Sequence, residues 1–328
     1  MTRTLRLVRR RLVGSVFVLL IVVVGSFLML EAAPGDAVDA YVVSMGGDAG
    51  LVEALRHSWG LDQSIWTRLA NYLWALLHLD LGWSVTFSRP IRDVVLERLP
   101  NTLLLMGSAT ALSFFLGSAL GIVAGARPGS LRDRLLSTGS LALYAVPSFW
   151  LALVLVIVFA VDLRWLPIAG IETIASNKTG LARAADIAWH LVLPVSALGF
   201  IYLALYLRMM RAGMAEVWRQ DFILAARARG LPRRRIVLAH VARNALLPLV
   251  TMLGLQSAQM LGGSVVIESV FSVPGLGRLA QEAVAGRDTP LLLGIILVSA
   301  VTVVLINLAV DIAYALLDPR VGANEATA

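Results

Sequence analysis

The sequence has 328 residues, of which 58% are hydrophobic and only 15% are charged, and its formal net charge is +7. Soluble globular domains are nearer half apolar and a quarter charged, so this composition excludes that class and indicates an integral membrane protein. The basic residues cluster at the ends of apolar runs, which is typical of membrane topology signals and argues against nucleic-acid binding.

The N-terminus carries several arginines, starting at Arg3, before an uncharged run over residues 12–30. A secretory signal peptide would need a shorter apolar core, whereas nineteen residues suit a membrane span. We therefore predict an N-terminal arm and first transmembrane helix over residues 1–30.

Five further uncharged runs are each long enough to cross a hydrocarbon layer of about 30 Å. They cover residues 101–126, 135–161, 187–207, 244–267 and 289–310. The sequence thus predicts an all-α polytopic membrane protein with six transmembrane helices and both termini on one side.

Residues 31–100 separate the first two runs and contain four tryptophans, Trp59, Trp66, Trp74 and Trp83. The apolar stretch Leu69–Leu79 is too short to span a bilayer. We interpret the segment as extracytoplasmic interfacial helices with aromatic rings at headgroup depth; a small packed subdomain is the alternative, and both stay open. Either could meet membrane lipid or an external partner.

The orientation follows from the loops. The side that holds the N-terminus, residues 127–134, residues 208–243 and the tail 317–328 carries most of the basic residues and few of the acidic ones. By the positive-inside rule this side is cytoplasmic, and residues 101–316 form the membrane core of five helices.

Residues 208–243 form a basic segment between two apolar runs and must lie in water or against headgroups. Good helix formers predict a helix over Met214–Arg229, which Gly230 ends in a left-handed turn before a second helix starts at Pro232. Small residues at positions 225, 226, 228 and 230 leave a shallow face where another protein could approach the backbone.

Prolines at positions 147, 194 and 248 interrupt three of the predicted spans and allow kinks. Gly254, Gly262 and Gly263 reduce the side-chain bulk of the fifth span. These residues could be hinges along a translocation path. Ordinary close packing of membrane helices is the favoured interpretation.

Two patterns follow the fifth run. An acidic residue predicted to lie at the interface precedes a Pro-Gly turn, and the segment contains Glu268, Pro274, Gly275 and Gly277. In the last helix Asp311, Tyr314 and Asp318 recur at helical spacing, so they share one face where the helix leaves the membrane.

The Ala225–Ala226 pair, Gly230 four residues later and the following Leu247–Pro248 resemble the cytoplasmic loop of ATP-binding cassette (ABC) importer permeases, particularly the oligopeptide and dipeptide branch. The 268–278 segment, the end of the last helix and Ala33–Pro34–Gly35–Asp36 match the same family in its order. The chain departs from the general pattern at Leu224, where the family has Glu, and at Ala245.

The resemblance implies that a short coupling helix in this loop sits in a groove of an ATPase subunit. The implied coupling residues are Asp221, Ala225, Ala226, Arg229, Gly230, Leu231 and Pro232. It also implies two ABC ATPase subunits that use ATP and Mg, a second permease subunit, and an extracytoplasmic solute-binding protein, in the inner membrane of a bacterium. Glu268, Pro274, Gly275, Gly277, Asp311, Tyr314 and Asp318 would be motif positions of unknown role.

No chemistry for an enzyme is visible. The chain has no cysteine, no histidine pair at helical spacing for a metal, and no phosphate-binding loop at its only lysine, Lys178. We predict no catalytic, metal or cofactor site, so ATP hydrolysis would fall to partner subunits. The competing class is an ion-coupled secondary transporter, but the six runs contain no Asp, Glu, Lys or Arg near the membrane midplane.

The resemblance favours short peptides as the transported solute. Relatives of this kind also carry nickel, glutathione or oligosaccharides, and the sequence does not choose among them. The residues that line the path stay unassigned.

Overall fold

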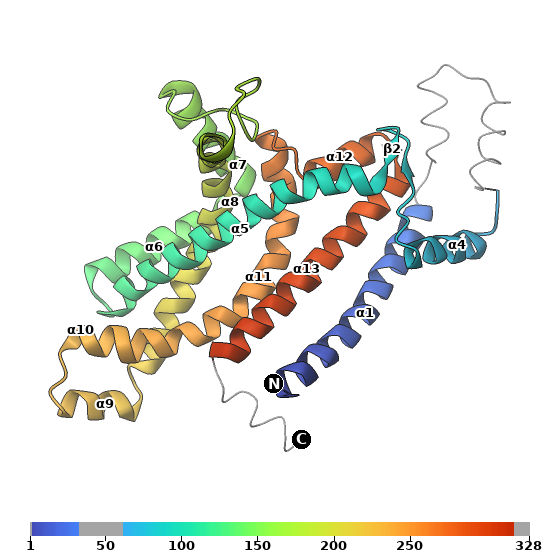
Figure 1. Cartoon of the computed structure of the whole chain (residues 1–328). Coiled ribbons are helices and arrows are strands. Elements are labelled where there is room, and N and C mark those ends of the chain that lie inside the picture. Colours follow the sequence, from blue (N-terminus) through green and yellow to red (C-terminus); the bar gives the residue numbers. More distant parts are fainter. Residues whose placement is uncertain (1, 33–61, 318–328) are drawn as a thin grey trace. The chain divides into compact units, whose positions relative to one another are not determined.

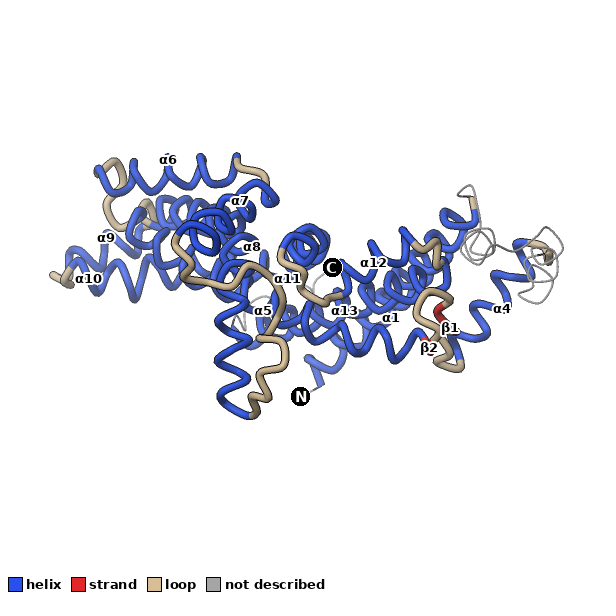
Figure 2. The backbone as a smooth tube through the Cα atoms, turned by 90° about the horizontal axis from the view of Figure 1, so that it is seen from above, coloured by secondary structure: helices blue, strands red, loops and turns tan. Residues whose placement is uncertain are grey.

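The computed structural model describes the backbone of residues 2–32 and 62–317, and side chains within residues 13–32 and 62–312. The predicted all-helical architecture is confirmed (Figure 1). In the described residues, strands are confined to one short hairpin, drawn in red in Figure 2.

The elements follow one another in a simple order. They are α1 Thr2–Glu31, α4 Ile65–Leu77, β1 Trp83–Ser84, β2 Arg89–Pro90, α5 Ile91–Gly125, α6 Leu131–Ala145, α7 Ser148–Leu155, α8 Gly180–Val217, α9 Asp221–Ala228, α10 Arg233–Arg235, α11 Arg243–Val270, α12 Leu276–Ala285 and α13 Thr289–Leu317. Two π-helical segments continue these helices: Val156–Asp162 follows α7, and Ile236–Ala242 joins α10 to α11.

Five helical stretches are long and apolar enough to cross a membrane. They are Val13–Glu31, Ile91–Gly125, Gly180–Val217, Arg233–Val270 and Thr289–Ile312. Several extend beyond the uncharged runs, because helices continue into polar flanks that hydrogen bonding and packing stabilise.

The third predicted span is not one helix. Helix α6 and the pair formed by α7 and its π-helical continuation meet at an angle of 101°, so a sixth span exists only if this bent pair is counted as one. The break lies at Val146 and Pro147, which both have extended backbone. Proline disfavours helical backbone in the preceding residue, so Pro147 breaks this span, whereas Pro194 and Pro248 lie within continuous helices.

The chain divides into two compact units. One comprises Thr102–Val273 with the end of α13 from Leu305, and the other comprises Thr2–Asn101 with Pro274–Val304. The first unit has two apolar cores, one around Leu198 and Met260 and one around Tyr206 and Val241. The cores of the second unit gather around Ile91 and around Phe27.

A seam of glycines sets the distance between α5 and α8 in the first unit. Gly117, Gly121 and Gly125 recur every four residues on α5 and so face the same side of that helix. A Cβ atom at Gly121 would lie 2.5 Å from Cβ of Met210 on α8, and the positions at Gly117 and Gly125 are almost as tight. Small residues at this spacing allow helix backbones in a membrane to approach closely.

In the second unit, Asp288 joins the β hairpin to the start of α13. Its Oδ2 accepts hydrogen bonds from Ser84 Oγ (2.7 Å) and Thr86 N (2.9 Å), and its Oδ1 accepts one from Leu291 N (3.1 Å). The carboxylate therefore caps the first turn of α13 while it fixes the hairpin loop. The strands pair antiparallel, with Trp83 opposite Pro90.

The glycine seam makes a stability prediction. Gly121→Ala forces a methyl group against Met210 and should lower the free energy of unfolding by about 1–3 kcal/mol, as overpacking does in other cores. The matched control is Gly107→Ala in the same helix, where nothing lies within 4 Å of the added Cβ. Thermal unfolding of the purified variants should show a lower midpoint for Gly121→Ala alone; equal midpoints would contradict the close approach.

Candidate functional site

After the end of α8, the basic segment forms the helices α9 and α10, which a short turn joins, as Figure 1 shows. Gly230 has a φ of +70°, and its N–H donates to the carbonyl of Arg227 at 2.9 Å. Leu231 N donates to the carbonyl of Ala226 at 3.3 Å. These two bonds make a complete Schellman motif, which satisfies the last carbonyls of α9 and requires a residue that tolerates positive φ.

The predicted helix Met214–Arg229 is wrong in one respect, because residues 218–220 interrupt it. Helix α8 ends at Val217, and α9 starts anew after Gln220, whose backbone is extended. The interruption places the Trp218 indole against α5, where Nε1 donates to the carbonyl of Gly125 at 2.9 Å. Asp221 then lies in the first turn of α9, where the helix dipole favours a negative charge.

Helix α9 buries one side and exposes the other. Ile223 and Ala226 are buried in the apolar core of Tyr206 and Val241, with Leu231 packed against it. The predicted shallow face is therefore wrong for Ala226, which lies three residues after Ile223 and so shares its buried side of the helix. The other three residues of the predicted shallow face, Ala225, Ala228 and Gly230, are exposed. Phe222, Leu224 and Arg229 are exposed as well.

Arginines fasten the turn to the end of α5. Arg233 donates through Nη2 to the carbonyl of Ala126 at 2.8 Å. The guanidinium carbons of Arg227 and Arg233 lie 5.1 and 5.9 Å from the centre of the Trp218 ring, within cation–π range. Pro232 is the N-cap of α10 and has the extended backbone that starts the next helix. The turn at Gly230 and Pro232, called the elbow below, is thus held on both sides of Gly230.

An ion pair between Asp133 and Arg211 ties α6 to α8 at the start of this segment. Asp133 is 1% exposed, and Arg211 donates to it through Nε and through Nη2, the latter at 2.9 Å. Gly129 N and Ser137 Oγ donate to the same carboxylate, at 2.8 and 3.2 Å. The two Arg211 nitrogens and the two further donors compensate the free-energy cost of taking the Asp133 carboxylate out of water.

The acidic residue of the 268–278 segment is buried within the protein. Glu268 is fully buried in the last turns of α11, and Thr102 Oγ1 donates to its Oε1 at 2.7 Å. Burial is possible because this hydroxyl from α5 reaches the carboxylate. The structure confirms the turn at Pro274, since Gly275 is the N-cap of α12 and Gly277 lies in its first turn. Asn101 Nδ2 donates to the Pro274 carbonyl at 2.7 Å.

The last predicted face is only partly described. Asp311 is half-buried on α13, and Tyr314 continues the same helix three residues later. Asp318 and the outer Ala33–Pro34–Gly35–Asp36 lie outside the described residues.

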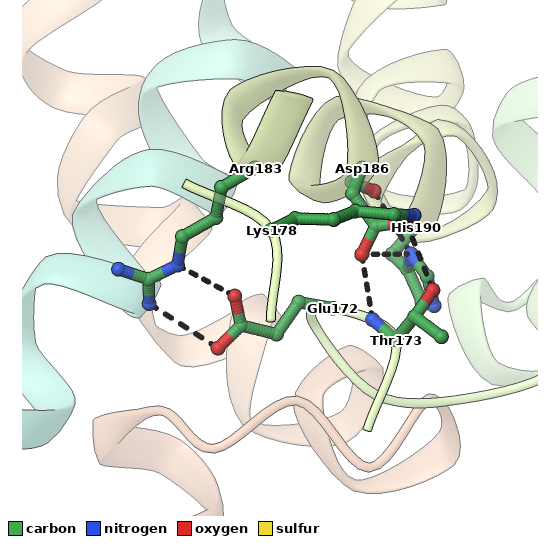
Figure 3. A network of polar contacts seen from close by, with 6 residues as sticks. All are labelled: Glu172, Thr173, Lys178, Arg183, Asp186 and His190. Carbon is green, nitrogen blue, oxygen red and sulfur yellow. Dashed lines mark hydrogen bonds and ion pairs between the residues drawn. The ribbon is translucent and has the colours of Figure 1, made fainter. Parts of the chain in front are cut away.

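A polar network at the opposite end of α8 from α9 was missed by the sequence analysis. Asp186 is 8% exposed and accepts from Lys178 Nζ (2.6 Å), Thr173 N (2.6 Å) and Thr173 Oγ1 (2.9 Å), as Figure 3 shows. His190 Nδ1 lies 2.8 Å from the backbone carbonyl of Asp186. The loop of residues 163–179 is thereby fastened to the first turns of α8, and the signal in the sequence was the charge cluster that flanks this loop.

Beside this network, Arg183 donates to Glu172 through Nε (2.6 Å) and Nη2 (3.2 Å). These two bonds hold the pKa of the Glu172 carboxyl below its usual value. Gly170 N also donates to the carbonyl of Phe271 at 2.8 Å, so the loop touches the end of α11. Among the described residues, no group of three or more His, Asp or Glu is placed to hold a metal ion.

Two protein-family matches cover almost the entire chain. Residues 117–323 match the family described as binding-protein-dependent transport system inner membrane component. Residues 4–106 match the N-terminal part of binding-protein-dependent transport system membrane components.

Individual relatives are similar over nearly their full length. A putative peptide transport system permease protein of Brucella abortus (strain 2308) is 39% identical over 96% of this chain and 98% of its own. The oligopeptide transport system permease protein AppB of Bacillus subtilis (strain 168) is 35% identical over 95% and 98%. The glutathione transport system permease protein GsiC of Escherichia coli O6:H1 is 36% identical over 97% and 99%.

The fold is shared with a solved transporter. An inward-facing structure of the MetNI methionine ABC transporter superposes with a TM-score of 0.56 at 18% identity, covering 69% of this chain and 97% of that one.

The ion pair between Asp133 and Arg211 yields a second stability prediction. Arg211→Ala leaves Asp133 buried without its counter-ion and should lower the free energy of unfolding by about 2 kcal/mol, less than for a fully enclosed pair because Arg211 is partly exposed. Arg208→Ala, at an exposed position on the same helix, is the control and should change little. Adding Asp133→Ala to the Arg211 variant should restore part of the loss; no restoration in thermal unfolding would show that the pair is not what stabilises this contact.

Proposed function

The chain belongs to the family of binding-protein-dependent transport system inner membrane components and is the multi-pass permease subunit of an ABC importer, and we propose that the solute it carries is a short peptide. The observation that carries this proposal is the similarity to peptide and oligopeptide permeases over at least 95% of the chain. Glutathione, itself a modified tripeptide, is the second candidate because of the similarity to the glutathione permease. Nickel and oligosaccharides receive no support from these relatives.

The subunit is a transport component that works with an ATPase and a binding protein. In our proposal it pairs with a second, homologous permease and with two ATPase subunits that bind ATP and Mg, while an external solute-binding protein delivers the peptide. Both termini and α9 lie in the cytoplasm, as the distribution of basic residues favours.

We propose that the exposed side of α9 is the coupling surface for an ATPase subunit. Phe222 and Leu224 are 45% and 68% exposed, and Ala225 and Ala228 leave room for close backbone approach. On the other side, Ile223 and Ala226 pack into the core shared with α8 and the start of the α11 stretch. A displacement of α9 would therefore move both long helices together.

Movement of α9 would reach its neighbours in two ways. Along the chain it would pass through Trp218 to α8 and through Gly230 to α11, and the shared apolar core contacts both helices. Trp218 and Arg233 also bond to the end of α5, which would move with them. ATP-driven closure of the ATPases would bias the equilibrium between inward-open and outward-open packing of these helices, because packed interfaces have discrete arrangements.

Peptide uptake tests the solute and the elbow together. Cells that lack this chain should lose uptake of labelled di- and oligopeptides, and the wild-type gene should restore it. Gly230→Val should fail to restore uptake although the protein inserts in the membrane, because a β-branched residue at this φ is strained by about 1–2 kcal/mol or more.

The matched control is Gly230→Asn, since asparagine tolerates the left-handed region and no atom lies within 4 Å of the added Cβ. Uptake restored by Asn and not by Val supports a conformational role for Gly230. Equal uptake with both variants would remove the elbow from the mechanism, and unchanged peptide uptake without the chain would refute the peptide proposal.

The coupling surface can be tested with a single thiol, because the chain has no cysteine. We expect Ala225→Cys, on the exposed side of α9, to crosslink to an ATPase subunit in native membranes. The buried Ala226→Cys is the neighbouring control and should react poorly. Failure of Ala225→Cys to crosslink, or stronger crosslinking from position 226, would count against this surface.

A further inference from the structure

Helix α4 lies across the end of the first span. Leu69 is buried with Phe27 of α1, the Phe27 and Tyr72 rings stack 5.6 Å apart, and Arg68 forms an ion pair with Glu31. Because the apolar stretch Val13–Glu31 crosses the membrane and Glu31 is its last residue, these contacts fix α4 at the boundary between hydrocarbon and water.

The side of α4 away from these contacts is aromatic and exposed. Trp66 and Trp74 are 68% and 66% exposed and lie two helical turns apart. Tryptophan favours this depth in membranes because its ring is apolar and its N–H needs a polar partner. The helix is thus amphipathic in the manner of a segment that rests at the lipid headgroups.

At the end of α4 a shallow pocket of about 410 Å³ is lined by Asn71, Trp74, Ala75, His78 and Asp80. His78 Nδ1 lies 2.9 Å from the Trp74 carbonyl oxygen, which can only accept, so Nδ1 carries the proton and Nε2 of the neutral ring is an acceptor. Within residues 62–312, the Asp80 side chain accepts a hydrogen bond at Oδ1 alone, from Gly82 N at 2.8 Å, so Oδ2 can accept from a ligand.

We propose that this pocket binds the primary ammonium of a phospholipid headgroup, that of phosphatidylethanolamine. An ammonium group carries only donors, which match the Asp80 carboxylate and His78 Nε2, and its charge is attracted to the face of Trp74. The rings of Trp74 and His78 lie 4.8 Å apart and wall the same pocket. The phosphatidylglycerol headgroup has no ammonium group, and its net negative charge is repelled by the Asp80 carboxylate.

The experiment measures lipid binding and is independent of transport. The full chain, purified in its assembled transporter, is placed in nanodiscs of equal parts phosphatidylethanolamine, phosphatidylcholine and phosphatidylglycerol, and native mass spectrometry counts the retained lipids. Wild type should retain phosphatidylethanolamine over phosphatidylglycerol by about threefold or more, the scale of one exposed ion pair. Phosphatidylcholine, whose quaternary ammonium has no N–H, should be retained less.

Asp80→Asn should abolish this preference, whereas Asp93→Asn, at an exposed acid on the first turn of α5, should leave it unchanged. In case Asp80→Asn disturbs the local turn, His78→Lys is the second variant: it adds a positive donor and should shift retention toward phosphatidylglycerol. Equal retention of the three lipids by wild type, or the same preference in the Asp80 and His78 variants, would overturn the proposal.

Discussion

The close approach of α5 and α8 along three glycines is the constraint on which the end of the permease that carries α9 depends. Because the two backbones nearly touch, the carbonyls of Gly125, the last residue of α5, and of Ala126 just after it come within reach of Trp218 and Arg233. Larger side chains at the seam would separate the helices and remove these acceptors. The position of α9 therefore depends on the three glycines of α5, whose lack of side chains lets α8 come close.

Helix α8 is fixed to neighbouring elements at both of its ends. It has 38 residues, which correspond to about 57 Å at 1.5 Å per residue. At one end Arg211 and Trp218 fasten it to α6 and α5, and at the other Asp186 fastens it to the 163–179 loop. Ionic groups sit at these ends, where water or headgroups lower the cost of charge, and the middle is packed by apolar contact.

Much of the fold could be predicted because its signals are local. Apolar runs mark the spans, and glycine before Leu-Pro marks the end of α9, where the left-handed turn at Gly230 is present. The failures came from contacts between distant residues. Nothing near Ala226 in sequence indicates that it packs against the core of Tyr206, and nothing near Glu268 indicates its hydrogen bond with Thr102, which is far away in the chain.

Other features were visible in the sequence but did not by themselves predict the structure. The spacing of Gly117, Gly121 and Gly125 fits a helix seam, yet it does not say which helix lies opposite. Pro147 predicted a kink. Whether a proline bends or breaks a helix depends on whether neighbouring packing stabilises a helical backbone at the residue before it, here Val146. In the described structure it does not, and α6 and α7 diverge by 101°.

The π-helical segment Ile236–Ala242 separates the elbow from the long helix that follows it. A π turn contains one residue more than an α turn, and one residue corresponds to about 100° of rotation around an α-helix. The π segment therefore rotates the faces of α11 relative to those of α10, compared with one uninterrupted α-helix. The arginines of α10 are exposed, whereas Ala245 and Leu249 on α11 are buried, so the extra residue of the π turn lets each part present its own face.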